Sequence, residues 1–407
     1  MAPQLGRILL ITANVGSLFE QDQRLHKAWL KTLIERISAE MADIVVIHMQ
    51  ETGGKHYVEC AWQVPKLIDE LASQLPNYPA VRAYLDLEHE APSFTALGSV
   101  VFIHNTSIGA VAQFNFSTSS YLPIEKGVHI SIDGLEDSPL IVKRKFPKDF
   151  WPTIKWGRKG YMQTRWKVNN KTFDFVNVHL FHDESNLALI HENPLLYSSN
   201  RKRALDYVLE QLSISEGNCS PLRFIFGDLN FRLDSPSFLN RLTERASPHP
   251  LDEQHGSVAD GLQVDHSLPV SDHLRRTVSA IEFRRESEAD MDSGCVLRIE
   301  KKRFDYFNHK KLLNDWKSYL EDDREAKNFK QLHELPITFP PTYPWSENPE
   351  ESEVMMKTRA PAWCDRVLMN ANAFALVKEG SPVYSSFGRE ICTGDHKPVA
   401  LAFSISL

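Results

Sequence analysis

Acidic and amide side chains stand where short apolar runs of the sequence end. The apolar run at residues 7–15 contains Asn14 near its end, and the run at 43–51 ends in Gln50 and Glu51. Carboxylate and amide oxygens are the ligands that hard cations such as Mg²⁺ prefer, whereas a zinc site would be richer in histidine and cysteine. A hard cation polarises phosphoryl oxygens and activates water. These residue types therefore predict metal-assisted hydrolysis of a phosphate ester.

Five more polar side chains follow the same rule, each at the end or just before the start of an apolar run: His179, Asp228, Asn230, Asp395 and His396. Taken singly, each has an ordinary structural explanation, since the GDLN segment suits a tight turn and His179 suits a half-buried position. Their shared placement favours a common catalytic rim, because strands fix positions while the loops that follow them give access.

The elements that must position these groups indicate a sheet-rich α/β fold. Helical spacing predicts helices over 22–39 and 57–74. Ser199 or Asn200 is expected to cap a further helix that runs to about Leu212. The expected strands are 7–15, 43–51, 98–104, 161–168, 173–180, 221–231, 365–370 and 398–403. Early alternation of strands and helices, followed by clustered strands, favours α/β layers over a helical bundle.

Two segments have a different character. Residues 247–270 lack periodicity and are rich in turn formers, which predicts a long surface loop. Residues 301–330 are highly charged and are expected to be helical. We find no internal repeat and no linker, so residues 1–407 are expected to form a single domain.

Composition excludes several classes of protein. The formal net charge of −7 argues against attraction of the whole protein to nucleic acid. The five cysteines form no CxxC pair, which favours reduced thiols over a disulfide framework. No apolar run approaches the roughly 20 residues that a membrane-spanning helix needs, and the first residues do not resemble a signal peptide. We therefore expect a cytoplasmic monomer.

Three motifs together resemble those of the inositol polyphosphate 5-phosphatases. They are IFGDLNFRL at 225–233, RAPAWCDRVL at 359–368 and GDHKPV at 394–399. The first and third are also similar to segments of a wider phosphohydrolase superfamily that includes DNase I and the AP endonucleases. The resemblance spans about residues 7–404, and TALGSV, RKGYMQTRW, FPPTYP and KKRFDYFN resemble the type I subgroup, which acts on soluble inositol phosphates.

The resemblance implies a DNase I-like α/β fold, a four-layer sandwich of two β-sheets flanked by helices, with the site at one rim. It also implies that Glu51 is the principal Mg²⁺ ligand, with Asn14 nearby. Asp228 would position or deprotonate the attacking water, and Asn230 beside it would hold the phosphate. The expected reaction is in-line attack of water on the 5-phosphate, which would end inositol trisphosphate and calcium signalling.

The same resemblance assigns roles to four further polar groups. His396 would contact the scissile phosphate and would be oriented by Asp365. His179 would stabilise the phosphate or the leaving oxygen. Asp395 would support the metal side of the site.

Cations are needed for the remaining phosphates, because each phosphomonoester carries about −1.5 to −2 charges at pH 7. Lys357 and Arg359 resemble the family's pair for the 4-phosphate, and Lys159 resembles the lysine near the 1-phosphate. Lys397 and Arg232 are further candidates. An exposed, solvated side chain is the alternative interpretation of each.

The sequence also departs from the family pattern. Many lipid-acting relatives have a lysine after the tyrosine that corresponds to Tyr343, where this chain has Pro344. We also find no long apolar loop to grip acyl chains, so inositol 1,4,5-trisphosphate and 1,3,4,5-tetrakisphosphate are favoured over phosphoinositide lipids. Lipid 5-phosphatase activity, a nuclease of the same superfamily and a non-catalytic inositol phosphate binder stay as alternatives. The AFSISL ending has no prenylation cysteine, which leaves peripheral membrane association open.

Overall fold

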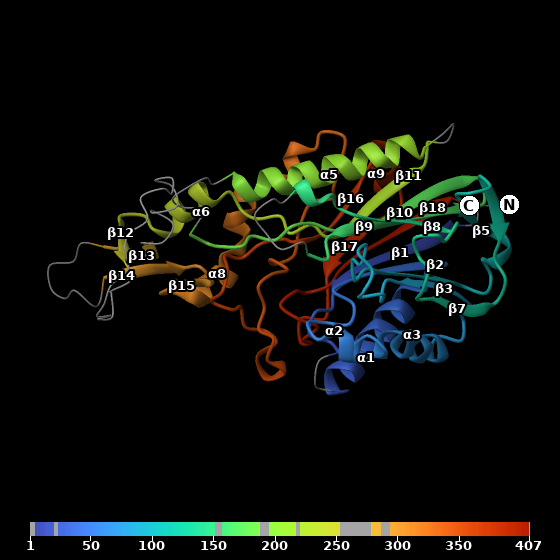
Figure 1. Cartoon of the computed structure of the whole chain (residues 1–407), viewed down its shortest axis with the longest axis horizontal. Coiled ribbons are helices and arrows are strands. Elements are labelled where there is room, and N and C mark those ends of the chain that lie inside the picture. The colour runs from blue at the N-terminus through green and yellow to red at the C-terminus, as the bar shows by residue number, and fades with distance from the viewer. Residues whose placement is uncertain are drawn as a thin grey trace.

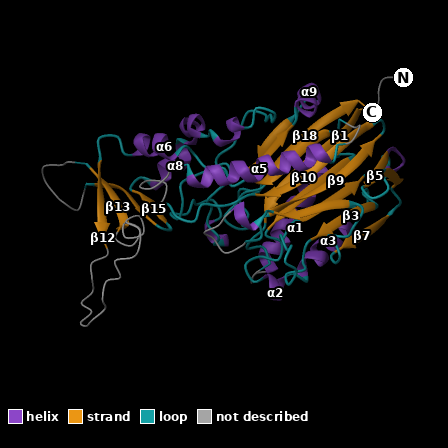
Figure 2. Ribbon diagram, turned by 45° about the horizontal axis from the view of Figure 1, so that its top comes forward, coloured by secondary structure: helices purple, strands orange, loops and turns teal. Residues whose placement is uncertain are grey.

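Two large β-sheets lie face to face in the computed structural model, which describes residues 5–19, 23–150, 157–187, 195–216, 220–252, 278–285 and 294–406 (Figures 1 and 2). The first sheet contains, in spatial order, β17 (Val383–Ser386), β18 (Val399–Ser406), β1 (Leu5–Asn14), β2 (Ile44–Gln50), β4 (Gly98–Ile103), β3 (Ala80–Leu85) and β7 (Gly127–Ser131). The second contains β16 (Asp365–Met369), β11 (Leu222–Asp228), β10 (Lys171–His179), β9 (Gly160–Val168), β5 (Val111–Asn115) and β6 (Ser120–Pro123), with β8 (Ile141–Lys145) also paired to β9.

Alternating side chains of the central strands build the layers. In β1, Leu10 faces the second sheet and joins one core cluster with Phe224 and Phe226 of β11. Its neighbour Leu9 belongs to the opposite cluster, together with Trp29 of α1 (Gln23–Glu40) and residues of α3 (Gln63–Gln74). Because successive side chains of a strand point to opposite faces, both faces of the sheet are buried.

The outer face of the second sheet is covered by α5 (Leu196–Ile214), whose Leu205 and Val208 pack with Val176 and Ile225 (Figure 2). The order of layers is therefore helix, sheet, sheet, helix. This arrangement confirms the predicted four-layer α/β sandwich. Among the described residues, no helix combines the length and apolar character needed to span a membrane.

Strand direction and register bring the polar strand ends to one edge. β1 and β2 are parallel, with Asn14 opposite Gln50. β10 and β11 are parallel as well, with His179 opposite Asp228. β16 runs antiparallel to β11 and starts at Asp365, which is paired with Asp228. The ends of the parallel strands and the start of the antiparallel strand consequently meet at the same rim.

Buried amides lock the two sheets together directly below this rim. Gln50 Nε2 of β2 donates to Asn177 Oδ1 of β10 over 2.8 Å. Asn177 Nδ2 in turn donates to the backbone oxygens of Met49 (3.1 Å) and Gly98 (2.8 Å). A buried network with its donors satisfied rigidifies its surroundings, so the relative position of the two strand sets is fixed close to the site.

A third, four-stranded sheet was not predicted. It consists of β12 (Ser247–Asp252), β13 (Val278–Arg284), β14 (Cys295–Glu300) and β15 (Arg303–Tyr306), and it lies at the opposite end of the molecule from the two termini (Figure 1). The helices α6 (Ser235–Leu242) and α8 (His309–Asn314) accompany it.

This sheet corrects two sequence predictions. Residues 247–252 form edge strand β12 instead of a loop, because an edge strand tolerates Pro248 and Pro250. Residues 253–270, the remainder of the predicted loop, lie outside the described residues. The expected helix over 301–330 was wrong in its first part, where 303–306 is a strand, and the rest is the short helix α8 followed by 3₁₀ turns at 316–322 and 325–328.

The predicted helices differ in their ends. The helix expected at 57–74 is divided into α2 (Tyr57–Cys60) and α3, and Pro65 lies in the first turn of α3, where proline is tolerated. The α5 helix begins at Leu196, before the predicted caps Ser199 and Asn200, and Leu195 at its N-cap provides no side-chain hydrogen bond. A short helix, α9 (Ala371–Glu379), follows β16 and was not predicted.

Candidate active site

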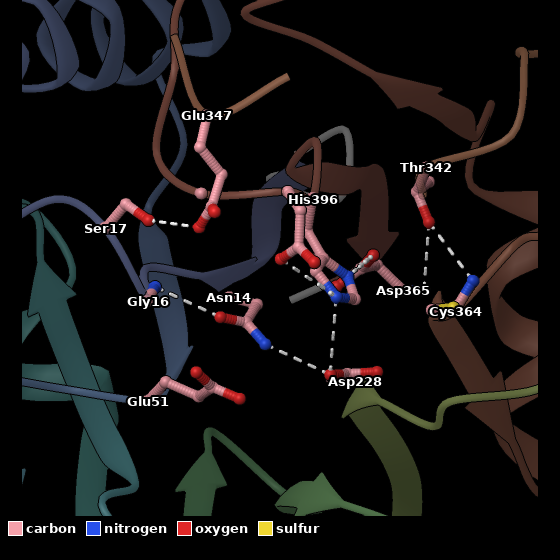
Figure 3. A network of polar contacts seen from close by, with 12 residues as sticks. Asn14, Gly16, Ser17, Glu51, Asp228, Thr342, Glu347, Cys364, Asp365 and His396 are labelled. Carbon is pink, nitrogen blue, oxygen red and sulfur yellow. Dashed lines mark hydrogen bonds and ion pairs between the residues drawn. The ribbon is translucent and has the colours of Figure 1, made fainter. Parts of the chain in front are cut away.

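Asp228, the last residue of β11, lies at the centre of the polar rim (Figure 3). Its Oδ2 accepts a hydrogen bond from Asn14 Nδ2 at 3.1 Å, across the gap between the two sheets. His179 Nε2 lies 3.1 Å from the same oxygen, and His396 Nε2 lies 3.8 Å from it. Burial alone would raise the pKa of Asp228, but the neighbouring His396 and His179 hold that pKa well below its usual range. Asp228 is therefore a carboxylate at neutral pH.

His396 is held in one orientation by Asp365. Its Nδ1 lies 2.8 Å from Asp365 Oδ2, and its ring packs against that of Tyr343 with centroids 4.8 Å apart. Thr342 Oγ1 accepts hydrogen bonds from the backbone nitrogens of Cys364 (3.1 Å) and Asp365 (3.2 Å), which fixes the start of β16. Burial lowers the pKa of His396, but Asp365 and Asp228 outweigh it and raise the pKa to about 10. An imidazolium with its Nε2–H directed at the rim results.

Three positively charged or imidazole groups surround Glu51. His179 Nε2 lies 3.8 Å from Glu51 Oε1, and Arg158 Nη2 lies 3.9 Å from Glu51 Oε2. Lys159 Nζ contacts His179 Nε2. Burial raises the pKa of Glu51, but Lys159 and His179 outweigh it and lower the pKa to about 2. Lys159 thus lies beside His179 and Glu51 and not on an exposed outer wall.

Glu51 and Asn14 fit a hard divalent cation. Glu51 has a positive φ of 56°, an uncommon conformation for a non-glycine residue that here orients a carboxylate in the site. A Cβ added to Gly16 would lie 2.8 Å from Glu51 Oε2, so only glycine leaves space beside that oxygen. Asn14 Oδ1 accepts from Gly16 N at 3.1 Å and keeps its second lone pair. An oxygen-rich, anionic donor set of this kind suits Mg²⁺ or Ca²⁺.

A second group of possible metal ligands is Asp228, Cys364 and His396, whose ligand atoms lie within 4.8 Å of one another. Burial raises the pKa of the Cys364 thiol well above its usual value, so the group is a neutral thiol and not a thiolate ligand. His396 is engaged by Asp365. The Glu51 side of the rim is therefore the better cation site.

Asp395 and Asn230 lie at the same rim. Asp395 Oδ1 is 3.8 Å from His396 Nε2, and burial, together with Glu51, raises the pKa of Asp395 although His396 opposes the shift. Asn230 Nδ2 donates to Leu180 O at 3.1 Å, and its Oδ1 accepts from Arg232 at 2.8 Å. The amide of Asn230 therefore orients Arg232.

Of the cations that were assigned to further phosphates, some stay candidates for this role and one does not. Arg232 lies over the Tyr343 ring at 4.3 Å, and Arg359 Nη2 donates to Asp183 O at 3.2 Å on the neighbouring segment. Lys357 lies two residues before Arg359 and pairs with Asp305 of β15 at 2.8 Å. Lys397, by contrast, is buried, donates to Ile391 O and lies 5.3 Å from the Trp345 ring centroid. We do not retain it as a phosphate ligand.

Sequence reasoning missed a buried ion network behind these cations. Arg201 of α5 is 1% exposed and pairs with both Asp183 and Glu325. Asp183 Oδ2 also lies 4.0 Å from Arg232 Nε. Arg158 was likewise missed, although it is the residue before Lys159. No spacing in the sequence identifies such partners, because they are separated by many residues and meet only in the folded chain.

The fold and this site define a class of protein, the hydrolases of phosphate esters built on a DNase I-like sandwich. A family model described as Endonuclease/Exonuclease/phosphatase family 2 matches residues 11–254 and 297–402. In solved structures, the inositol polyphosphate 5-phosphatase domain of SPsynaptojanin, in complex with inositol (1,4)-bisphosphate and a calcium ion, matches with a TM-score of 0.53 at 15% identity over 99% of this chain and 84% of that one. The likeness shows the shared fold.

Curated relatives narrow the class. A Caenorhabditis elegans protein named probable type I inositol 1,4,5-trisphosphate 5-phosphatase is 63% identical over 98% of this chain and 99% of its own length. Human inositol polyphosphate-5-phosphatase A is 40% identical over 98% of this chain and 93% of its own. The chain belongs to the inositol polyphosphate 5-phosphatase family.

Proposed function

We propose that the protein is an Mg²⁺-dependent phosphatase that removes the 5-phosphate from inositol 1,4,5-trisphosphate and inositol 1,3,4,5-tetrakisphosphate. The observation that carries this proposal is the meeting of Glu51, Asp228 and His396, from distant parts of the chain, around one rim (Figure 3). The names of the two relatives support the choice of substrate. Soluble substrates of this kind suit a cytoplasmic, monomeric enzyme.

The geometry suggests a role in phosphate hydrolysis for each of these residues. Mg²⁺ held by Glu51 and Asn14 would polarise the phosphoryl oxygens when bound. Asp228 is ionised and accepts hydrogen bonds, so it orients a water for in-line attack. The imidazolium of His396 donates from Nε2 to a phosphoryl oxygen, because Asp365 holds Nδ1. No covalent enzyme intermediate is required.

The cations beyond the rim would hold the phosphate next to the scissile one. Arg232 lies over the Tyr343 ring and Arg359 donates to Asp183 O, and both arginines lower the pKa of Tyr343, although burial raises it more. This pair, with Lys357, can bind the 4-phosphate and replace the contact that a lysine at Pro344 would have made. Arginine suits this role because its planar fork matches phosphate oxygens.

A nuclease with the same metal-side residues is the main alternative. Its substrate has one charge on each diester, whereas the site provides several cations close together. The net charge of −7 also disfavours a nucleic acid. A non-catalytic binder would be expected to lack one of the catalytic groups, and Glu51, Asp228 and His396 are all in place.

The test compares four substrates at equal phosphate concentration with and without Mg²⁺: inositol 1,4,5-trisphosphate, the 1,3,4,5-tetrakisphosphate, phosphatidylinositol 4,5-bisphosphate in mixed vesicles, and duplex DNA. We expect Mg²⁺-dependent release of phosphate from both soluble substrates, with inositol 1,4-bisphosphate as the product of the first. Faster turnover of the lipid, or cleavage of the DNA, would contradict the proposal.

A further inference from the structure

The turn between β14 and β15 lies directly against the segment that carries Lys357 and Arg359. Arg359 Nη1 donates to the backbone oxygen of Lys301 at 2.8 Å. The backbone nitrogen of Phe304 donates to Lys357 O, also at 2.8 Å. The third sheet thus provides a wall for the phosphate-binding segment, although it is separate from the catalytic strands.

Hydrogen bonds of Asn186 connect this wall to the catalytic sandwich. It is only 7% exposed and follows strand β10 by seven residues. Its Nδ2 lies 3.2 Å from Glu300 O, 3.0 Å from Arg303 O and 3.0 Å from Thr358 O. Its backbone nitrogen donates to Lys301 O at 3.1 Å. One buried residue therefore fixes the turn relative to both the end of β10 and the Arg359 segment.

The acidic side chains of the turn are already neutralised. Glu300 Oε1 pairs with Arg298 at 2.7 Å, and Arg303 lies 3.6 Å from the same oxygen. Asp305 pairs with Arg303 at 2.6 Å and with Lys357 at 2.8 Å.

Two cations of the turn, Lys301 and Lys302, do not take part in these ion pairs. Lys301 and Lys302 are exposed at its tip, and within the described part of the chain neither has an ion-pair partner. The local charge is therefore positive although the whole protein is acidic, and such a local excess of charge attracts a polyanion.

The order of these cations can be compared with the order of phosphates on the ring. The scissile 5-phosphate belongs at Asp228 and His396, and the neighbouring 4-phosphate belongs at Arg232 and Arg359. The turn that carries Lys301 and Lys302 is the next part of the wall, because the backbone oxygen of Lys301 accepts a hydrogen bond from Arg359. On a six-membered ring, the position next to 4 on the side away from 5 is position 3.

We propose that Lys301 and Lys302 bind the 3-phosphate of inositol 1,3,4,5-tetrakisphosphate and so determine how well the enzyme uses the tetrakisphosphate relative to the trisphosphate. This inference rests on the proposed function, since it needs the 5-phosphate at Asp228. The trisphosphate has no 3-phosphate, so it gains nothing from the two lysines except general attraction. The turn is thus a specificity element for the degree of phosphorylation of the ring.

The test measures kcat/KM of the wild type and of the double variant Lys301→Ala, Lys302→Ala on both substrates. The matched control is Lys310→Ala, Lys311→Ala, which removes the same charge from exposed positions of α8 in the same part of the molecule. For the Lys301 variant we expect kcat/KM to fall by about five- to tenfold more on the tetrakisphosphate than on the trisphosphate, the range for loss of a charge-assisted hydrogen bond at an exposed site. The effect should be in KM, with kcat nearly unchanged.

Equal losses on the two substrates, or a loss no larger than that of the control, would overturn the proposal. Wild-type turnover of the trisphosphate separates this outcome from failure of the proposed function. If the wild type releases phosphate from the trisphosphate and the ratio of the two substrates does not respond to the Lys301 variant, the function stands and the 3-phosphate assignment is wrong. If the wild type hydrolyses neither substrate, the function itself is wrong.

Discussion

Asp228 and His396 show how two residues acquire chemical roles from their surroundings. The carboxylate is kept ionised by the imidazole groups near it, and the imidazole is kept protonated by Asp365 and Asp228. Neither state follows from the residue type alone. The motifs at 225–233 and 394–399 predicted which residues matter, but only the fold shows that they meet.

Removal of either group should abolish most of the turnover. We expect Asp228→Ala and His396→Ala each to lower kcat by about 10²-fold or more, because each acts on the transition state. Steady-state phosphate release from inositol 1,4,5-trisphosphate measures the effect. Asp206→Ala and His104→Ala, at a surface position of α5 and after β4, are the controls. A variant at Asp228 or His396 with turnover close to that of the controls would mean that its role is misassigned.

At the scale of elements, eight strands of the two large sheets were predictable, whereas β3, β5–β8, β17 and the whole third sheet were not. Apolar runs, and alternation of apolar and polar residues in two cases, predicted these eight strands close to their observed positions, because buried strand faces leave a hydrophobic pattern in the sequence. The strands β12–β15 were missed because they mix proline, charge and apolar residues, and the charge of residues 301–330 does not distinguish a helix from a strand. The inter-sheet amides of Gln50 and Asn177 were missed too, because their pairing exists only after the sheets pack.

Gly227 allows β11 to pack closely against β10, and this leads to a prediction at the same scale. A Cβ at this position would lie 2.0 Å from Val178 O, which is backbone and cannot move aside alone. We expect Gly227→Ala to lower the free energy of unfolding by about 3 kcal/mol or more, the upper end for overpacking. Urea unfolding measures it. Gly109→Ala, where nothing lies within 4 Å, should change stability by much less, and equal effects would contradict the close approach.

His48 in β2 predicts how stability depends on pH. It is fully buried, its ring stacks on Phe226 at 3.7 Å, and its Nδ1 lies 3.1 Å from Phe226 O. Burial lowers its pKa from 6.5 to about 3, although the bond to Phe226 opposes the shift. Between these two values the unfolded chain binds a proton that the folded chain does not, so stability falls as pH falls from 6.5 towards 3.

The variant His48→Asn isolates the contribution of His48 to the pH dependence of stability. The wild type should lose more stability per pH unit than His48→Asn, by about 0.7 kcal/mol near pH 6.5 and by about 1.4 kcal/mol near pH 5, because the variant has no group that titrates at this position. Denaturant unfolding at pH 7, 6 and 5 gives both slopes. Parallel slopes would show that His48 is protonated, or exposed, in the folded protein.

At the scale of the whole molecule, the third sheet shares a buried apolar cluster with the sandwich through residues such as Ile281, Leu297 and Phe304, and Asn186 adds polar contacts at the turn between β14 and β15. In the proposed function, this arrangement would let one part carry the metal and the water while another positions cations for the rest of the substrate. Candidate site residues at strand ends were easier to locate from the sequence than those of the turn, because Asn186 and Lys301 become neighbours only through the packing of distant segments.

Asn186→Ala tests whether Asn186 positions the substrate-binding segment and not the catalytic residues. Loss of its three amide contacts should loosen the Arg359 segment and raise KM for inositol 1,4,5-trisphosphate several-fold, while kcat stays within about twofold because Asp228 and His396 are untouched. Asn170→Ala, in the turn between β9 and β10, is the matched control. A fall in kcat with unchanged KM would show that Asn186 supports the catalytic rim and not the substrate wall.

The central claim is that a divalent cation binds at Glu51 within reach of Asp228 and His396. The most direct measurement is phosphate release from inositol 1,4,5-trisphosphate as a function of Mg²⁺ concentration, for the wild type and for Glu51→Gln. Because loss of even an outer partner of a metal ligand costs about 10- to 100-fold in metal affinity, the half-saturating Mg²⁺ concentration of the variant should rise at least tenfold. Activity of the wild type that survives removal of divalent cations, or an unchanged Mg²⁺ requirement in Glu51→Gln, would contradict the account.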